Sequence, residues 1–287
     1  MGTRLVAIAC VLLAGTAAVV LAAAPERTGS HAAGFSPETV TVAPAAFEHV
    51  RPGEYLHASG RPTRAPRIHV TARNPVEIMR YQVTLGEYAR CVDAGACKPA
   101  DGRGPMDAPV TGVSHIDAAA YAAWMSKATD ETWRLPTDEE WAQAAAEKFV
   151  PDVEPAEEDP DNPARAWLSS YSREAALGRK ADPVAKPKGT FGTNSNGVSD
   201  LAGNVWEWTS TCYVRVTLAD DEGSVSEVEN CGVHVVEGFH RTYMSNFIRD
   251  GKSGGCAVGL PPDNLGFRLV REQPGFLGRL KASLGRS

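Results

Sequence analysis

The chain has 287 residues, of which 43% are hydrophobic and 22% charged, and its formal net charge is -6. This length and composition suit one large globular domain or two small ones. A net negative charge without a basic stripe argues against nucleic acid as a partner.

The N-terminal segment differs in composition from the rest of the chain. From Leu5 to Ala24 it carries no charge and is rich in Ala, Val and Leu. Such a run is long enough to span a bilayer, and its small-residue end suits signal cleavage. We expect residues 1–24 to be a signal peptide or an N-terminal membrane anchor, followed by a linker over residues 25–38. The protein is then periplasmic or secreted, or is anchored to the inner membrane through this segment alone.

The next part of the chain predicts strands and turns, and then helices. From Thr39 to Val83, short alternating runs are punctuated by prolines, as is typical of strands and turns. Three helix starts follow, at Thr84, Ser114 and Thr137, each a hydroxyl residue with an acid three positions later. The hydroxyl can cap free backbone N–H groups while the acid bonds back to the cap. The apolar residues that follow at helical spacing are predicted to be core.

Five cysteines follow the N-terminal segment: Cys91, Cys97, Cys212, Cys231 and Cys256. An oxidising compartment favours disulfides, and an odd number leaves one thiol over. Gly95 can end the first helix, and a turn there would fold Cys97 back toward Cys91. We therefore predict a Cys91–Cys97 disulfide that acts as a structural staple.

The segment Asn196–Trp208 combines turn-forming residues with acids. Its sequence, NGVSDLAGNVWEW, places Asp200, Asn204 and Glu207 among apolar residues. A turn-rich backbone with carboxylates, whose carbonyls can point inward, is how an oxygen cage for calcium is built. The alternative is a hairpin corner whose acids face water.

Three motifs in a fixed order then indicate a known family. They are RLPTDEEW at Arg134–Trp141, GNVWEW at Gly203–Trp208 and NLGFR at Asn264–Arg268. With these motifs the chain resembles the formylglycine-generating enzymes, also called sulfatase-modifying factors, over residues 39–272. Residues 273–287 are left as a basic tail. The resemblance implies a compact α+β fold related to the C-type lectins, with much irregular structure.

The resemblance also implies a calcium site at the GNVWEW motif. Asp200 and Glu207 would supply side-chain oxygens, and Gly203 and Val205 would supply backbone carbonyls. Oxygen ligands of this kind suit a hard cation such as calcium.

A copper site is implied nearer the C-terminus. Enzymes of the family oxidise a protein cysteine with dioxygen and a copper(I) ion that two cysteines, five residues apart, hold. Cys256 matches the second of these and is the candidate catalytic residue and copper ligand, whereas Gly251 stands at the first. Thiolates select copper(I), and Cys231 or Met244 could add a soft ligand if the fold brings either close.

Three pairings of the last three cysteines are open. Cys256 can bond to Cys212 or Cys231, or else Cys212 and Cys231 pair and leave Cys256 as a free thiol.

Three functions follow from the resemblance. The first is a copper- and dioxygen-dependent oxidase that acts on a cysteine of an exported protein or peptide. The alternative is a non-catalytic maturation factor for a periplasmic redox enzyme such as copper nitrite reductase, because accessory proteins encoded beside that enzyme are similar around GGCAVG and PPDNLGFR. The third, a non-haem iron oxygenase, is disfavoured because the histidines are scattered and no additional helical domain is present. His115, His234 and His240 are the histidines worth mutating.

Overall fold

The computed structural model describes residues 35–149, 184–219, 224–253 and 264–273, together with Leu168, Ser172 and Ala176. The predicted segment 1–24, most of the linker, Cys256 and nearly all of the basic tail lie outside the described residues. Within the part of the chain that is described, none of the helices has the length and apolar character needed to cross a bilayer.

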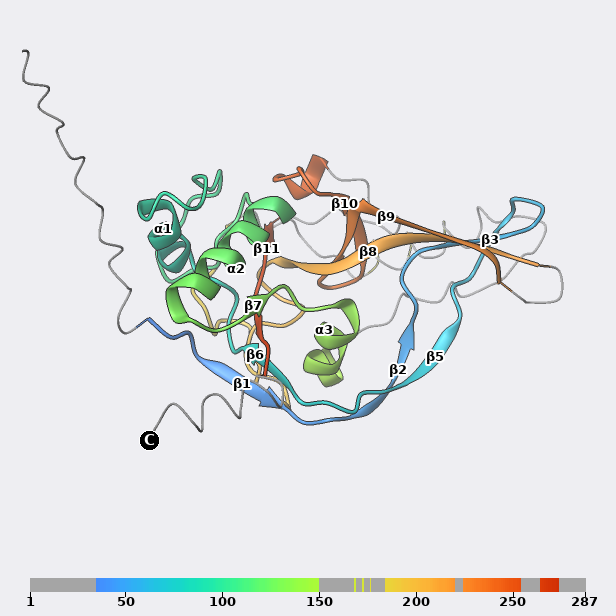
Figure 1. The fold of residues 1–287 in the computed structure, drawn as a ribbon, viewed down its shortest axis with the longest axis horizontal. Coiled ribbons are helices and arrows are strands. Elements are labelled where there is room, and N and C mark those ends of the chain that lie inside the picture. The colour runs from blue at the N-terminus through green and yellow to red at the C-terminus, as the bar shows by residue number, and fades with distance from the viewer. Residues whose placement is uncertain are drawn as a thin grey trace, which may run out of the picture.

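The strands of the described residues form three sheets (Figure 1). One has the order β1-β6-β12-β7, a second has the order β10-β9-β8-β3-β4 with β11 added beside β8, and the third is the ribbon of β2 and β5. Most pairings are antiparallel, but β8 runs parallel to β3 and β11. The strand bounds are β1 Thr39–Val42, β2 Ala46–Val50, β3 Glu54–His57, β4 Pro62–Thr63, β5 Arg67–Thr71, β6 Val76–Met79, β7 Trp133–Arg134, β8 Trp206–Leu218, β9 Ser224–Glu237, β10 Thr242–Ser245, β11 Leu265–Gly266 and β12 Val270–Arg271.

The three helices begin where the sequence predicts. They are α1 (Leu85–Asp93), α2 (His115–Thr129) and α3 (Asp138–Ala145), and the single turns η1 (Ala146–Lys148) and η2 (Gly251–Ser253) are 3₁₀ helices. Each α-helix starts with a complete capping box, in which the hydroxyl accepts from the third backbone N–H and the acid accepts from the cap. Separate helices and mostly antiparallel sheets confirm the predicted α+β class.

An aromatic cluster joins the helices to the C-terminal strands. The rings of Tyr88 in α1 and Tyr121 in α2 stack with centroids 5.7 Å apart, and Phe267 lies edge-on to Tyr121 at 5.4 Å. All three side chains are buried. Aromatic pairs at such distances add to the free energy that burial of their surface supplies, so Phe267 anchors the NLGFR segment beneath the helices.

The long hairpin of β8 and β9 extends across the molecule, away from α1 and α2 (Figure 1). Trp206, Glu207 and Trp208 form its first residues, so the predicted turn ends at Val205. The hairpin register shifts around Cys212, which pairs with His234 while the next residue pairs with Asn230. This bulge changes the direction of the side chains next to Cys212 from that of a regular strand pair. One of the side-chain clusters described below lies there.

Candidate functional site

The turn before β8 is built around the carboxylate of Glu207, which is fully buried. Arg268, between β11 and β12, bonds both of its oxygens: Nε lies 2.6 Å from Oε2 and Nη2 lies 2.7 Å from Oε1. The indole Nε1 of Trp141 in α3 donates to Oε2 at 3.0 Å. The three motifs that carry the family resemblance therefore meet at one carboxylate.

Oxygens of the residues predicted to bind calcium converge on the amide of Gln82. Its Nε2 lies 2.9 Å from the carbonyl of Asp200, 3.3 Å from that of Gly203 and 2.9 Å from Oε1 of Glu207. Oε1 of Gln82 is buried and has no hydrogen-bond partner in the described part of the chain. An amide nitrogen carries two hydrogens, so it cannot satisfy all three oxygens at once.

The carboxylate of Asp200 does not face Gln82 but accepts hydrogen bonds from a neighbouring loop. Its two oxygens accept from the backbone N–H groups of Phe191, at 2.8 Å, and of Gly189, at 2.5 Å. Asp200 itself has a positive φ of 60°, which turns its carbonyl toward Gln82. The oxygens of Asp200, Gly203 and Glu207 around the Gln82 amide form an oxygen cluster. This cluster fits a calcium ion only if the ion displaces the Gln82 amide and shares Glu207 with Arg268. Calcium binding stays a prediction.

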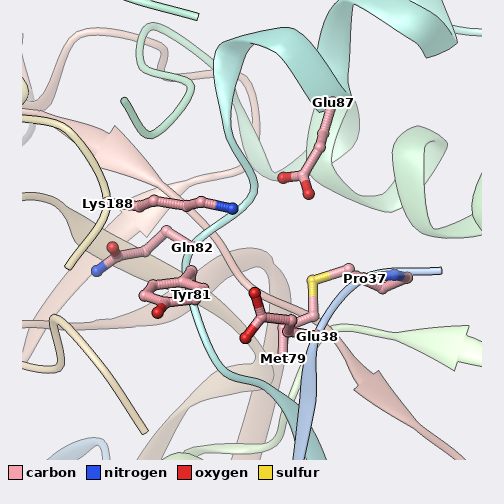
Figure 2. A pocket seen from close by; sticks show the side chains of 7 residues that line it. All are labelled: Pro37, Glu38, Met79, Tyr81, Gln82, Glu87 and Lys188. Carbon is pink, nitrogen blue, oxygen red and sulfur yellow. The ribbon is translucent and has the colours of Figure 1, made fainter. Parts of the chain in front are cut away.

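A small surface pocket adjoins this cluster through Gln82. It is partly open to solvent and is lined by Pro37, Glu38, Met79, Tyr81, Gln82, Glu87 and Lys188 (Figure 2). The Lys188 ammonium lies 5.0 Å from the centre of the Tyr81 ring. Among the described residues that line the pocket, Gln82 alone also contacts the oxygens of Asp200, Gly203 and Glu207.

A second cluster lies at the bulge of the β8–β9 hairpin. Cys212 and Cys231 form a disulfide, and Nε2 of His234 lies 3.7 Å from Cys212 Sγ. His115, the first residue of α2, stacks on His234 with ring centroids 3.7 Å apart. The carboxylate of Glu229 lies within 4.8 Å of both sulfurs. The sequence offered these residues singly, and the fold brings them together.

Both rings of the histidine stack are neutral near pH 7. Burial, and after it the neighbouring His234, lowers the pKa of His115 to about 4. Burial also lowers the pKa of His234, although its hydrogen bond with Asn246 opposes the shift. A neutral imidazole keeps one nitrogen lone pair free to accept a proton or bind a metal.

The segment that leads to Cys256 is anchored to α2. The guanidinium of Arg249 bonds Asp117 at 2.8 Å and Asp101 at 2.9 Å, and Gly251 is buried in η2. Cys256 lies outside the described residues. Of the two soft ligands suggested to assist it, Cys231 is bonded to Cys212. The other, Met244, is buried.

Comparison with known proteins gives the family. Residues 28–273 match the family described as the Sulfatase-modifying factor enzyme 1-like domain, FGE-sulfatase. The chain belongs to this family. It is 36% identical over 116 residues to the Inactive C-alpha-formylglycine-generating enzyme 2 of Mus musculus, which covers 39% of the chain and 34% of the relative. It is 36% identical over 110 residues to the Formylglycine-generating enzyme of Mycobacterium tuberculosis, which covers 36% and 33%.

The matched region thus spans about a third of the length of these two relatives. Among solved structures, the chain is similar to PvdO from Pseudomonas aeruginosa, with a TM-score of 0.51, 24% identity and coverage of 83% of this chain and 95% of that one. This likeness concerns the fold, and it agrees with the expected formylglycine-generating-enzyme architecture.

One charged network in this FGE-sulfatase chain was missed by the sequence reasoning. Arg241 bonds Glu237 at 2.7 Å and Asp138 at 3.2 Å, and His49 Nε2 lies 2.8 Å from Asp138. All four side chains are buried. Asp138 belongs to the RLPTDEEW motif, in which the predicted helix start is formed by Thr137 and Glu140 and assigns no role to Asp138. No local pattern points to Glu237 or Arg241 as its partners.

Proposed function

We propose that this FGE-sulfatase protein is a diverged oxidase that uses Cys256 as a copper(I) ligand and oxidises a cysteine of an exported polypeptide with dioxygen. The observation that carries the proposal is the pairing of the other sulfurs. Cys91 bonds Cys97, and Cys212 bonds Cys231. After residue 24, Cys256 is therefore left without a cysteine to pair with. A free thiolate is the kind of ligand that copper(I) prefers.

Gly251 limits what the chain can do alone. It stands where the family resemblance expects the first cysteine, so Cys256 supplies one thiolate and not two. The cysteine of the bound polypeptide would supply the second. Copper(I), when held by these thiolates, would supply the activation of dioxygen. The chain's own part is to hold the polypeptide and present Cys256 beside the substrate sulfur.

Export of the protein is part of the proposal. Disulfides form and persist in oxidising compartments, and two are present here. We therefore place the protein in the periplasm or outside the cell, with residues 1–24 as its signal or its anchor. The partner is an exported protein or peptide, and nucleic acid is not expected.

A second candidate function is a non-catalytic maturation factor for a periplasmic redox enzyme, such as copper nitrite reductase. Gly251 favours it, because the loss of one cysteine removes half of the expected copper ligands. A relative whose name includes the word inactive shows that the family has members without the activity. As a maturation factor, the protein would use its fold to bind the redox enzyme and would not catalyse a reaction.

The first experiment maps free thiols in the purified, unreduced protein by alkylation and peptide mass spectrometry. Cys256 is expected to carry the label, while Cys91, Cys97, Cys212 and Cys231 stay unlabelled. A disulfide between Cys256 and any other cysteine would remove the oxidase proposal.

The second experiment separates the oxidase from the maturation factor. Copper(I) is titrated in competition with a chromophoric chelator, with and without a cysteine-containing peptide. We expect the peptide to tighten binding to the wild type, Cys256→Ala to lose binding, and Gly251→Cys to bind copper without peptide. Mass spectrometry of the peptide under air then reports turnover. Copper binding without oxidation of any exported cysteine peptide favours the maturation factor.

A further inference from the structure

The two disulfides of the described chain differ in their access to solvent. Cys91 and Cys97 are buried, with 0% and 9% exposure. Cys231 is exposed and Cys212 is half-buried. Thiol–disulfide exchange requires an attacking thiolate to reach one of the sulfurs. A reductant can therefore reach the Cys212–Cys231 bond in the folded chain, while the Cys91–Cys97 bond is protected.

A histidine lone pair faces the accessible disulfide. The side-chain nitrogen of Asn246 donates to the Cys231 carbonyl at 2.7 Å, which leaves its oxygen to accept from His234 Nδ1 at 2.6 Å. Nδ1 of the neutral ring must then carry the proton, so Nε2 carries the lone pair. That lone pair lies 3.7 Å from Cys212 Sγ. A disulfide sulfur has no proton to donate to it, whereas a thiol or a thiolate-bound metal ion would give it a partner.

The surroundings of this lone pair are those of a ligand site. His234 is 6% exposed, and its ring is held between Asn246 on one side and the stacked ring of His115 on the other. Nε2 of His115 is also buried and has no hydrogen-bond partner among the described residues. One ligand atom from each of Cys212, Glu229 and Cys231 lies within 4.8 Å of the others. The two sulfurs and the carboxylate thus form one group at the hairpin bulge, and the His234 imidazole adjoins this group at Cys212.

We propose that the Cys212–Cys231 disulfide is a reducible pair whose dithiol form binds a zinc ion through Cys212, Cys231 and His234, with Glu229 as the fourth ligand. Two thiolates with one nitrogen and one oxygen form a donor set that zinc accepts in tetrahedral geometry. Asn246 acts as a positioning residue, because its bond to Nδ1 fixes the tautomer that turns Nε2 to the metal. The proposed zinc site uses no atom of Cys256 and does not depend on the proposed oxidase activity.

The chemistry has two balanced steps. A dithiol reductant gives two electrons and two protons to the disulfide, which becomes two thiols, and the reductant itself becomes a disulfide. Zinc then binds the two sulfurs as thiolates and releases their two protons. Reoxidation reverses both steps and expels the ion.

The test uses the full chain with Cys256→Ser as the background, so that its outcome is independent of the proposed copper site. The protein is reduced with dithiothreitol without denaturant, freed of reductant under argon and titrated with cobalt(II), whose absorption reports thiolate ligation. We expect one equivalent to bind and zinc to displace it, while the unreduced protein gives no such absorption. Alkylation mapping should label Cys212 and Cys231 and leave Cys91 and Cys97 unlabelled.

Variants decide which atoms hold the ion. Cys212→Ser should abolish the thiolate absorption, and Asn246→Leu should weaken binding by about 10- to 100-fold through the lost ring orientation. Circular dichroism confirms that each variant stays folded, and the double variant Cys212→Ser with Cys231→Ser shows whether the fold tolerates loss of the bond. The proposal is overturned if the bond resists reduction until the chain unfolds, if the reduced chain binds no cobalt, or if Cys212→Ser binds cobalt as before.

Discussion

Arg268 holds Glu207 by two short charge-assisted bonds, of 2.6 and 2.7 Å, at a place where both side chains are buried. Replacing Arg268 by Met would leave the carboxylate without its cation in a site that water does not reach. Removal of one partner of a buried ion pair costs about 3–5 kcal/mol. We therefore expect Arg268→Met to lower the free energy of unfolding by that amount, as measured by urea denaturation.

The exposed pair of Arg215 and Glu54 provides the matched control. Its atoms are equally close, at 2.6 Å, but the two side chains are 58% and 39% exposed. Water screens an exposed pair of this kind, so Arg215→Met should change stability little. Equal losses in Arg215→Met and Arg268→Met would mean that burial does not set the strength of the Glu207 pair.

Calcium binding at the turn is tested through Gln82. Its amide fills the space among the oxygens of Asp200, Gly203 and Glu207, so a calcium ion must displace it. In Gln82→Ala that space is open to the ion. We expect calcium to raise the melting temperature of both proteins, and to raise that of Gln82→Ala more, because ligand binding to the folded state stabilises it.

Chelation provides the reverse measurement for the calcium prediction. Addition of a chelator should lower the melting temperature of Gln82→Ala, and Glu207→Ala should abolish the response of either protein. A melting temperature that ignores both calcium and chelator in Gln82→Ala would show that the oxygen cluster is a hydrogen-bonded corner.

Local features of this fold could be predicted from the sequence because their partners are close along the chain. A hydroxyl and an acid three residues apart define each capping box, and Gly95 brings Cys97 back to Cys91 within one turn. The sequence does not predict the Cys212–Cys231 bond, because a separation of 19 residues does not choose among three possible pairs.

The contacts that make the site are long-range, and single-residue patterns do not encode them. Arg268 reaches Glu207 across 61 residues, and Gln82 reaches it across 125. The family motifs predict Glu207 as a calcium ligand, but they do not show that Arg268, Trp141 and Gln82 donate hydrogen bonds to its carboxylate. His115 and His234 seemed scattered because only the docking of α2 on the hairpin stacks them.

The Ser114 cap positions His115 at the start of α2. Ser114 Oγ accepts from the backbone N–H of Asp117 at 3.2 Å, and Asp117 accepts from the backbone N–H of Ser114 at 2.9 Å. Ser114→Ala removes the capping oxygen and should cost about 1 kcal/mol, whereas Ser114→Asn keeps an acceptor and should cost less. Urea midpoints at constant slope measure the difference. A loss in Ser114→Asn as large as that in Ser114→Ala would contradict the capping role.

The buried pair of Asp138 and Glu237 predicts how stability depends on pH. Burial acts to raise the pKa of Asp138, but the charge of Arg241 and a hydrogen bond with Glu237 outweigh it and hold this pKa at about 2. Burial raises the pKa of Glu237 well above its usual value, and the neighbouring Asp138 adds to the shift. Glu237 therefore keeps its proton where Asp138 is ionised.

The two shifts act on stability in opposite directions. Asp138 has a lowered folded-state pKa, so its contribution is present above the unfolded value of 3.8 and is lost as pH falls through about 2. Glu237 has a raised folded-state pKa, so its contribution is present below the unfolded value of 4.5 and is lost as pH rises through the folded value. As pH rises from 4.5 to the folded pKa of Glu237, the wild type should thus lose stability, by up to about 1.4 kcal/mol per pH unit for one proton.

Glu237→Gln separates this effect from other titrations. Glutamine matches the shape of the neutral acid and cannot ionise. The variant should therefore lack the loss of stability that starts above pH 4.5, while it keeps the loss below pH 3.8 that is due to Asp138. Asp138→Asn should instead be destabilised throughout the neutral range, because it leaves the buried Arg241 with weaker compensation. The measurement is the free energy of unfolding from urea titrations across pH, with the exposed Glu139→Gln as the control. The opposite outcome is a free energy of unfolding of Glu237→Gln that falls with rising pH as steeply as that of the wild type and of Glu139→Gln. In that case Glu237 is ionised in the folded protein, and Arg241 pairs with two carboxylates.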